Sequence, residues 1–295
     1  MTERIVVAVD GGPASQSALE WVLIRARSQP VTVEITSVVE TSWADYALVD
    51  YRSGYQSVVD AAADRAREVL SAHDVQTTLR SGDPAHALIA ASRTADLVVI
   101  GTNHTGSIAG ILHGTLPLRV AGRSRCTTVV VPAGWTDSGS GVVAGWADDG
   151  TAETVVAFAA AEAERRGEEL TLVHSWHVPP AIGLDITTSA FRFADLETAS
   201  REQFSGVVAR TRAAHPTLFV VEHLTPGSAS VALVSRAQRA ALVVVGSHAR
   251  SALGGLILGS VSHDVLMNMP APVAVLSHPD EPIEVLPEIL DEYLI

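Results

Sequence analysis

The chain has 295 residues, of which 47% are hydrophobic and 18% charged, a composition typical of globular proteins rather than disordered ones. Its net charge of -13 argues against general nucleic-acid binding, because affinity for a polyanion depends on basic residues. Neither a signal peptide nor a long apolar membrane span is evident. We therefore expect a cytoplasmic protein that does not bind a membrane.

Strands and helices are predicted to alternate along the first half. Asp10-Gly11-Gly12-Pro13 ends the first strand as a turn, and Ser15 is expected to cap the helix that follows. The predicted elements are a strand at 5–9, a helix at 15–23, a strand at 31–39, an irregular connection at 40–56, a helix at 58–72, a strand at 75–79, a short helix at 85–92, and strands at 97–100 and 127–131 with a helix between them.

The second half repeats this order. Its predicted elements are a strand at 142–146, a helix at 153–166, a strand at 170–176, a helix at 191–212, and strands at 219–224, 242–245 and 272–276. Such alternation indicates an α/β fold in which each half is a doubly wound domain with a parallel sheet. We place the first domain at 1–135, a linker at 136–141, the second domain at 142–279 and an acidic tail at 280–295.

Each domain contains a glycine-rich loop, and the two loops have identical internal spacing. The first reads ADLVVIGTNHTGSIAGILHGT over 95–115, and the second reads ALVVVGSHARSALGGLILGS over 241–260. A glycine followed by Ser or Thr at the start of a helix offers amides and a hydroxyl to an anion, as in phosphate-binding loops. The same glycines could equally serve close helix-to-sheet packing, and the spacing does not separate the two. The aligned positions are Gly101 with Gly246, Gly110 with Gly255, Gly114 with Gly259, and Thr115 with Ser260.

The ordered features resemble the universal stress protein family in its tandem two-domain form. They are the strand ending in Asp10, the turn Gly82-Asp83-Pro84-Ala85, the two glycine loops and the last strand of each half. The family signature is a glycine, two residues, a glycine, nine residues, then a glycine with Ser or Thr. Both copies lack the second glycine, which is His104 in one loop and Ala249 in the other. The resemblance implies a five-stranded parallel sheet of the adenine nucleotide alpha hydrolase-like type in each domain.

The resemblance also implies a ligand, ATP, with Mg²⁺ as an accompanying ion, between the first and fourth strands. In the first domain Asp10 would contact the ribose or adenine side, and Val38 would offer its backbone to adenine. Gly101, Gly114 and Thr115 would surround the ribose and phosphates. In open parallel sheets ligands bind at the carboxyl ends of strands where the winding reverses, and Asp10 and Gly101 are expected to meet there.

In the second domain Ala147 aligns with Asp10, so the acidic anchor is replaced there, unless Asp148 or Asp149 substitutes after a small shift. We therefore expect two unequal sites. Self-association as a homodimer, through the last strand of a domain, is a further implication of the resemblance. The matching ligand positions of the second domain are Gly246, Gly259, Ser260 and, one turn into the helix, Ser262.

No residue pattern demands catalysis. The chain has no lysine, which excludes a Walker-type loop, and its histidines show no zinc-ligand spacing, so we expect no metal site of its own. Cys126, the single cysteine, is expected to be inert packing. The sequence thus favours an ATP-binding regulatory stress-response protein without dedicated catalysis, with an unidentified protein partner.

Two other functions stay open. One is a nucleotide-free degenerate member that acts as a protein-interaction scaffold; the other is a slow ATPase, disfavoured because no water-activating base accompanies the loops. The tail from Pro287 onward has apolar spacing that suits a short amphipathic helix docked on the body or on a partner. A frayed terminus is the alternative.

Overall fold

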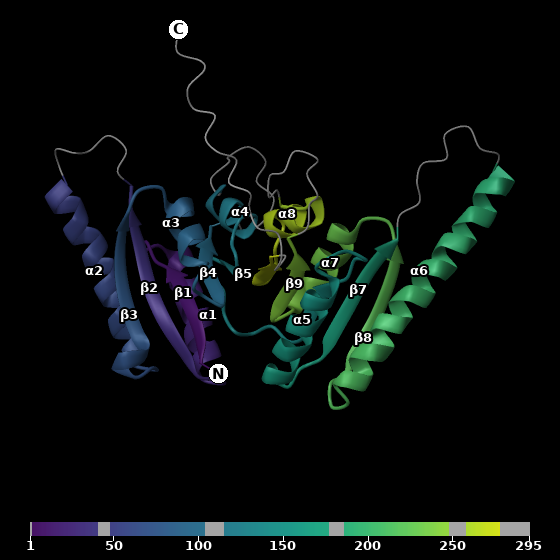
Figure 1. Ribbon diagram of the computed structural model, residues 1–295, viewed down its shortest axis with the longest axis horizontal. Helices are drawn as coiled ribbons and strands as arrows, with labels where there is room; N and C mark the ends of the chain where they lie inside the picture. Colours follow the sequence, from purple (N-terminus) through teal and green to yellow (C-terminus); the bar gives the residue numbers. More distant parts are fainter. Residues whose placement is uncertain (1, 41–47, 104–114, 177–185, 248–257, 278–295) are drawn as a thin grey trace, which may run out of the picture.

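The computed structural model describes residues 2–40, 48–103, 115–176, 186–247 and 258–277. Figure 1 shows two α/β halves side by side, each with its sheet between helices. The tail at 280–295 lies outside the described residues. In the first half the elements are β1 Glu3–Ala8, α1 Pro13–Ala26, β2 Val31–Val39, α2 Leu48–Arg67, β3 Val75–Ser81, α3 Pro84–Ala91, β4 Leu97–Thr102, α4 Thr115–Ala121 and β5 Thr127–Pro132.

The second half has the same order of elements. They are β6 Val142–Gly145, α5 Ala152–Arg166, β7 Leu170–Trp176, α6 Ile186–Ala214, β8 Val220–Pro226, α7 Ala229–Arg236, β9 Leu242–Gly246, α8 Ser260–Met267 and β10 Val273–Leu276. Among the described residues, no helix combines the length and the apolar character needed to cross a bilayer.

The strands form one ten-stranded sheet in the order β3-β2-β1-β4-β5-β10-β9-β6-β7-β8. Within each half all neighbours are parallel, which confirms the predicted five-stranded parallel sheets. The halves join where β5 and β10 pair antiparallel, with Val129 opposite Ala274. The sequence did not indicate this junction, because nothing in the local pattern of either strand specifies a partner so distant along the chain.

The pairing of β5 with β10 tests the expected self-association through the last strand of a domain. The last strand of each half, β5 or β10, has a paired neighbour on both sides within the chain. The prediction that two chains associate through the last strand of a domain is therefore wrong, because neither strand has a free edge. A homodimer formed through another surface stays a prediction.

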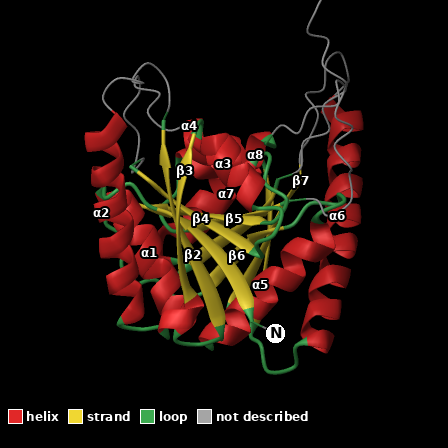
Figure 2. Cartoon of the chain, turned by 60° about the vertical axis from the view of Figure 1, so that its left-hand side comes forward, coloured by secondary structure: helices red, strands yellow, loops and turns green. Residues whose placement is uncertain are grey.

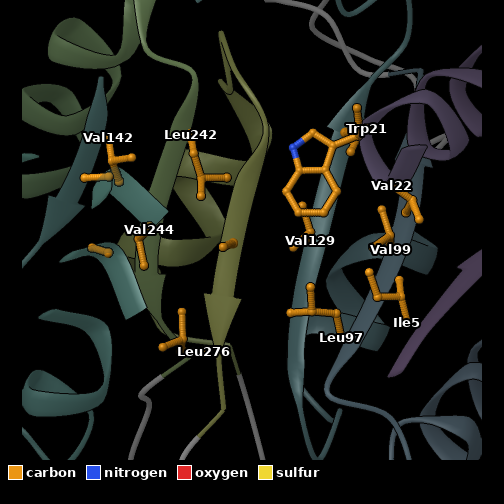
Figure 3. Packing of buried hydrophobic residues seen from close by; sticks show 14 of the residues in the cluster. Ile5, Trp21, Val22, Leu97, Val99, Val129, Val142, Leu242, Val244 and Leu276 are labelled. Atoms are coloured by element: carbon orange, nitrogen blue, oxygen red, sulfur yellow. The ribbon is translucent and has the colours of Figure 1, made fainter. Parts of the chain in front are cut away.

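Helices cover both faces of the sheet, and each face has one core that runs through both halves. On one face α1, α2, α5 and α6 pack against the sheet, and on the other face α3, α4, α7 and α8 do so. Figure 2 shows the sheet between these two layers. Figure 3 shows the first core, where Trp21 and Val129 of one half lie across from Leu242 and Leu276 of the other. The two domains thus bury apolar surface against each other.

Among the helices with predicted bounds, three begin two residues or more from the expected position. Helix α6 begins at Ile186 rather than at 191. Helix α1 begins at Pro13 with Gly12 as its N-cap, since proline is favoured in the first turn, where its missing N–H costs nothing. Ser15 lies inside that turn, so the prediction that it caps the helix is wrong. Helix α2 begins at Leu48, within the stretch expected to be irregular. Its residues 52–54 face solvent, and an exposed polar turn carries no apolar periodicity to detect.

Candidate functional site

A cavity of about 220 Å³ lies in the first domain where the winding of the sheet reverses, at the carboxyl ends of β1 and β4. Three predicted site residues, Asp10, Val38 and Gly101, line it. Thr115 is the first residue of α4, and the next residue, Leu116, lines the cavity. Gly114 lies outside the described residues. The structure therefore brings together the positions predicted from the first and fourth strands.

The backbone of Val38 faces this cavity. In a parallel ladder successive residues direct their N–H and C=O groups to opposite neighbours. The N–H of Val9 donates to the carbonyl of Thr36 at 2.9 Å, and that of Gly82 donates to the carbonyl of Val39 at 2.9 Å. The N–H and C=O of Val38 therefore point in the same direction as those of Thr36, toward the side of β2 on which β1 lies. At the level of Val38, β1 has already ended at Ala8. One main-chain donor and one acceptor are thus presented beyond the end of β1.

Asp10 is held at the mouth of the cavity by a compact turn. Its Oδ1 accepts a hydrogen bond from the N–H of Gly12 at 2.8 Å. The Ser15 hydroxyl accepts from the N–H of Asp10 at 3.3 Å and donates to the carbonyl of Gly12 at 3.0 Å. Asp10 is exposed, so this turn fixes a solvated carboxylate beside the cavity rather than burying it.

Gly101, the last but one residue of β4, and Gly246, the last residue of β9, are required by packing. A Cβ built on Gly101 would lie 2.2 Å from the backbone C and O of Ala14. A Cβ on Gly246 would lie 2.1 Å from Oγ1 of Thr151. Both values are far below van der Waals contact, so each glycine lets the start of the first helix of its own half, α1 or α5, approach the sheet. The packing interpretation explains these two residues, although both also line their cavities.

The second domain has a matching cavity of about 150 Å³ at the ends of β6 and β9. All four residues predicted for this domain, Gly246, Gly259, Ser260 and Ser262, line it. Ser260 is exposed at the start of α8. The buried hydroxyl of Ser262 donates to the carbonyl of Gly246. That hydroxyl therefore already serves to tie α8 to β9.

The strand register places Ala147 at the position of Asp10, as the alignment predicted, because Ile5 and Val142 pair with Leu97 and Leu242 respectively. Asp149 takes over the turn: its Oδ1 accepts from the N–H of Thr151 at 2.8 Å and from its hydroxyl at 2.7 Å. The shift suggested by the sequence thus occurs, with a longer connection before α5 than before α1.

Sequence reasoning missed most of the other residues that line the first cavity. Among them are Ser37 on β2, Tyr55 on α2 and Leu88 on α3. Ser37 directly precedes Val38, so its place could have been inferred from the strand. Tyr55 lies in the stretch at 40–56, which the sequence predicts to be an irregular connection, and no motif there indicates a ligand contact.

Charged groups beside the first cavity tie α3 to α4. Asp83 caps α3 by accepting from the N–H of His86 at 2.8 Å, and it pairs with Arg119 of α4 at 3.0 Å. The hydrogen bond from His86, followed by that from Arg119, lowers the pKa of the Asp83 carboxyl. Asp83 therefore stays ionised and holds the two helices together at neutral pH.

Within the described ranges, no group of three or more His, Cys, Asp and Glu side chains is placed to hold a metal ion. His104, His113 and His248 lie outside those ranges. Burial raises the pKa of the Cys126 thiol to about 12, so the thiol stays protonated, and a protonated thiol is a poor nucleophile.

The fold and the two cavities define a tandem doubly wound α/β protein with a crevice at the switch point of each half. The sequence profile described as Universal stress protein family matches residues 1–132 and again residues 142–277. The chain belongs to the universal stress protein family.

Two relatives match this chain over nearly their whole length. One universal stress protein of Mycobacterium tuberculosis is 28% identical in an alignment that covers 92% of this chain and 96% of the relative. Another from the same organism is 27% identical in an alignment that covers 94% of this chain and 96% of the relative. A crystal structure of a universal stress protein from Archaeoglobus fulgidus superposes with a TM-score of 0.68 over 95% of this chain and 98% of that one, at 18% identity. This last similarity is one of fold.

Proposed function

We propose that this universal stress protein is a regulatory adenine-nucleotide-binding protein of the stress response, with ATP held between β1 and β4 of the first domain. The observation that carries the proposal is the main chain of Val38, which presents a donor and an acceptor into a cavity at the end of β1. Such a pair suits the edge of a nucleobase, and the family resemblance makes adenine the expected base.

The other residues of the cavity fit the rest of a nucleoside. Apolar side chains such as Leu88 and Leu116 line its walls, and ligand pockets are mostly apolar with a few fixed polar groups. Asp10, held by Gly12, is an acceptor for ribose hydroxyls at the mouth. The described residues line the part of the cavity in which the base and the ribose would lie. When bound, the phosphates would extend toward the start of α4, and Mg²⁺ would bind chiefly through them.

The proposed role is binding without dedicated catalysis. A ligand that binds only the folded chain stabilises it by mass action, so that occupancy follows nucleotide concentration. The cytoplasm is the proposed compartment, since nucleotide is available there. A scaffold that binds no nucleotide is the competing function, and a slow ATPase is the other.

A thermal-shift titration of the full chain with ATP and GTP tests the proposal. We expect ATP to raise the melting temperature in a saturable manner and more than GTP does. Asp10→Ala should reduce the shift, whereas Asp60→Ala, an exposed carboxylate on α2, should leave it unchanged. The absence of any shift with adenine nucleotides would remove the proposal. Single-turnover release of phosphate that Asp10→Ala abolishes would replace it with the ATPase.

A further inference from the structure

Three aromatic rings form a cluster beside the cavity of the second domain. The ring centroids of Trp146 and His174 lie 4.7 Å apart, those of Trp146 and Phe204 5.5 Å, and those of His174 and Phe204 5.3 Å. Phe204 is fully buried and Trp146 is 7% exposed. Nδ1 of His174 lies 3.0 Å from the carbonyl oxygen of Trp146. The three rings therefore form one fixed, packed body.

The hydrogen bonds of the sheet identify the residues of the first domain that are equivalent to Trp146 and His174. Trp146 follows β6 and donates its N–H to the carbonyl of Val173 at 2.8 Å, as Val9 follows β1 and donates to Thr36. His174 is the next residue after Val173, as Ser37 is after Thr36. Small side chains, valine and serine, thus stand in the first domain where tryptophan and histidine stand in the second.

The counterpart of the third ring, Phe204, is found by aligning α6 with α2. Along α2 the fully buried residues are Val59, Ala63 and Ala66, and the same spacing along α6 gives Phe204, Val208 and Thr211. These helices precede β3 and β8, which begin at equivalent places, Val75 and Val220. Phe204 is therefore the counterpart of Val59. By the same alignment, the counterpart of Tyr55 is Ser200, which has no ring.

The two cavities differ accordingly. In the first domain the cavity extends past the end of β1 to Ser37 and Val38 on β2 and to Tyr55 on α2. In the second, among the described residues, the cavity is walled by Trp146 and reaches β7 only at Val173. Its volume is about 150 Å³, against about 220 Å³ in the first domain. Val9 and Ser37, the counterparts of Trp146 and His174, both line the first cavity, so the aromatic cluster stands at the end of β7 where the first cavity extends over the end of β2.

We infer that the nucleobase is held in the first domain alone, at the end of β2 beside Tyr55, and that Trp146, His174 and Phe204 close the second domain to it. Each chain therefore binds one nucleotide, and the second domain contributes to the structure without binding one. This inference rests on the proposed nucleotide binding and adds its stoichiometry and the position of the base.

Equilibrium dialysis of the full chain with labelled ATP measures the stoichiometry. One ATP per chain is expected. Two per chain would overturn the inference while leaving the proposed function in place, whereas no saturable binding would overturn both. The two failures are thus distinguishable by the same measurement.

Transplanting the cluster tests where the single site lies. The double variant Ser37→His, Val59→Phe places two of the three aromatic residues in the first domain and should abolish ATP binding. The mirror variant His174→Ser, Phe204→Val should keep the binding of the first site at its original affinity. Loss of binding in the mirror variant, with retention in the transplant, would place the nucleotide in the second domain and overturn the inference.

Tyr55 gives a second test that leaves the core of α2 untouched. Because contact of a base with an aromatic side chain contributes on the order of 1 kcal/mol or more, Tyr55→Ala should weaken ATP binding about tenfold. Tyr55→Phe, which keeps the ring, should bind as the parent does. Equal affinity of Tyr55→Ala and the parent protein would overturn the assigned position of the base.

Discussion

The guanidinium of Arg25, on α1 of the first domain, donates to both carboxylate oxygens of Glu162, on α5 of the second, at 2.7 and 2.8 Å. Both side chains are 4% exposed. Glu3 accepts from the other side of Arg25 at 2.7 Å, and Arg165 donates to Glu162 at 2.7 Å. Burial alone would lower the pKa of Arg25, but its hydrogen bond to Glu3 and the charge of Glu162 raise it. The two domains are therefore joined by a buried ionic network as well as by the β5–β10 pairing.

Replacing Glu162 should weaken this join. Glu162→Gln leaves Arg25 and Arg165 facing a neutral amide, and removal of one partner from a buried ion pair typically costs about 3 kcal/mol or more. Urea unfolding should show a lower free energy of unfolding by about that amount. Glu197→Gln, which removes the partner of Arg201 in a largely exposed pair, should cost less than about 0.5 kcal/mol. Equal effects of the two substitutions would contradict the role of the network.

Gly101 should not tolerate a side chain. Because a Cβ there would overlap the backbone of Ala14 at 2.2 Å, Gly101→Ala must push α1 away from β4, at a cost of about 2 kcal/mol or more. Gly54 in α2 is the matched control, since a Cβ there meets nothing within 4 Å. Gly54→Ala should stabilise the helix by roughly 0.5–1 kcal/mol. The two melting temperatures, compared with that of the parent, check both signs.

Gly246 and Thr151 should show coupled effects. In Gly246→Ala the new Cβ would lie 2.1 Å from Oγ1 of Thr151 and 3.0 Å from its Cβ. Thr151→Ala removes the hydroxyl, so the cost of Gly246→Ala should be smaller in that background, by about 1 kcal/mol. A double-mutant cycle of unfolding free energies measures this coupling. Strictly additive costs would mean that another contact limits the site.

Lowering the pH should decrease the free energy of unfolding because of His174. Burial lowers its pKa from 6.5, although the Trp146 carbonyl and the charge of Asp148 act to raise it. Between pH 6.5 and the lowered pKa the unfolded chain binds this proton more readily than the folded chain does, so stability is complete above about pH 6.5 and falls as the pH decreases. In His174→Phe this part of the decrease should disappear from unfolding curves recorded between about pH 7.5 and about pH 5.5.

A residual acid dependence is expected in that variant. Burial and the charge of Arg236 also lower the pKa of His223, so the same sign of pH dependence arises there. His223→Gln combined with His174→Phe should therefore flatten the curve further than either change alone. A slope that stays the same in both single variants would contradict the assignment.

Strands rich in β-branched and aliphatic residues were predictable from the sequence. The bounds expected for β2 and β7 agree with the structure at both ends, because Val, Thr and either Ile or Leu recur along each strand. The duplicated loops placed Gly101 and Gly246 within one residue of the ends of β4 and β9. The sequence also placed Asp10 and Gly101 at one crevice, since parallel strands bring their carboxyl ends to one edge, and the family resemblance added Val38.

Relationships between distant residues were not predictable in this way. Arg25 and Glu162 are 137 residues apart in the chain, and no local pattern connects them. Trp146, His174 and Phe204 come from three elements, and only the register of β6 and β7 with the packing of α6 makes them neighbours. The reason that Gly101 is glycine likewise lies in the approach of α1, which spacing alone does not reveal.

The antiparallel pairing of β5 with β10 gives this protein the arrangement of a symmetric pair while keeping its two members on one polypeptide. In a pair of identical chains, every substitution would appear twice and would alter both crevices together. Here a tryptophan can replace a valine on one side only. A single chain can thus keep an open cavity in one half while packed side chains fill the equivalent space in the other.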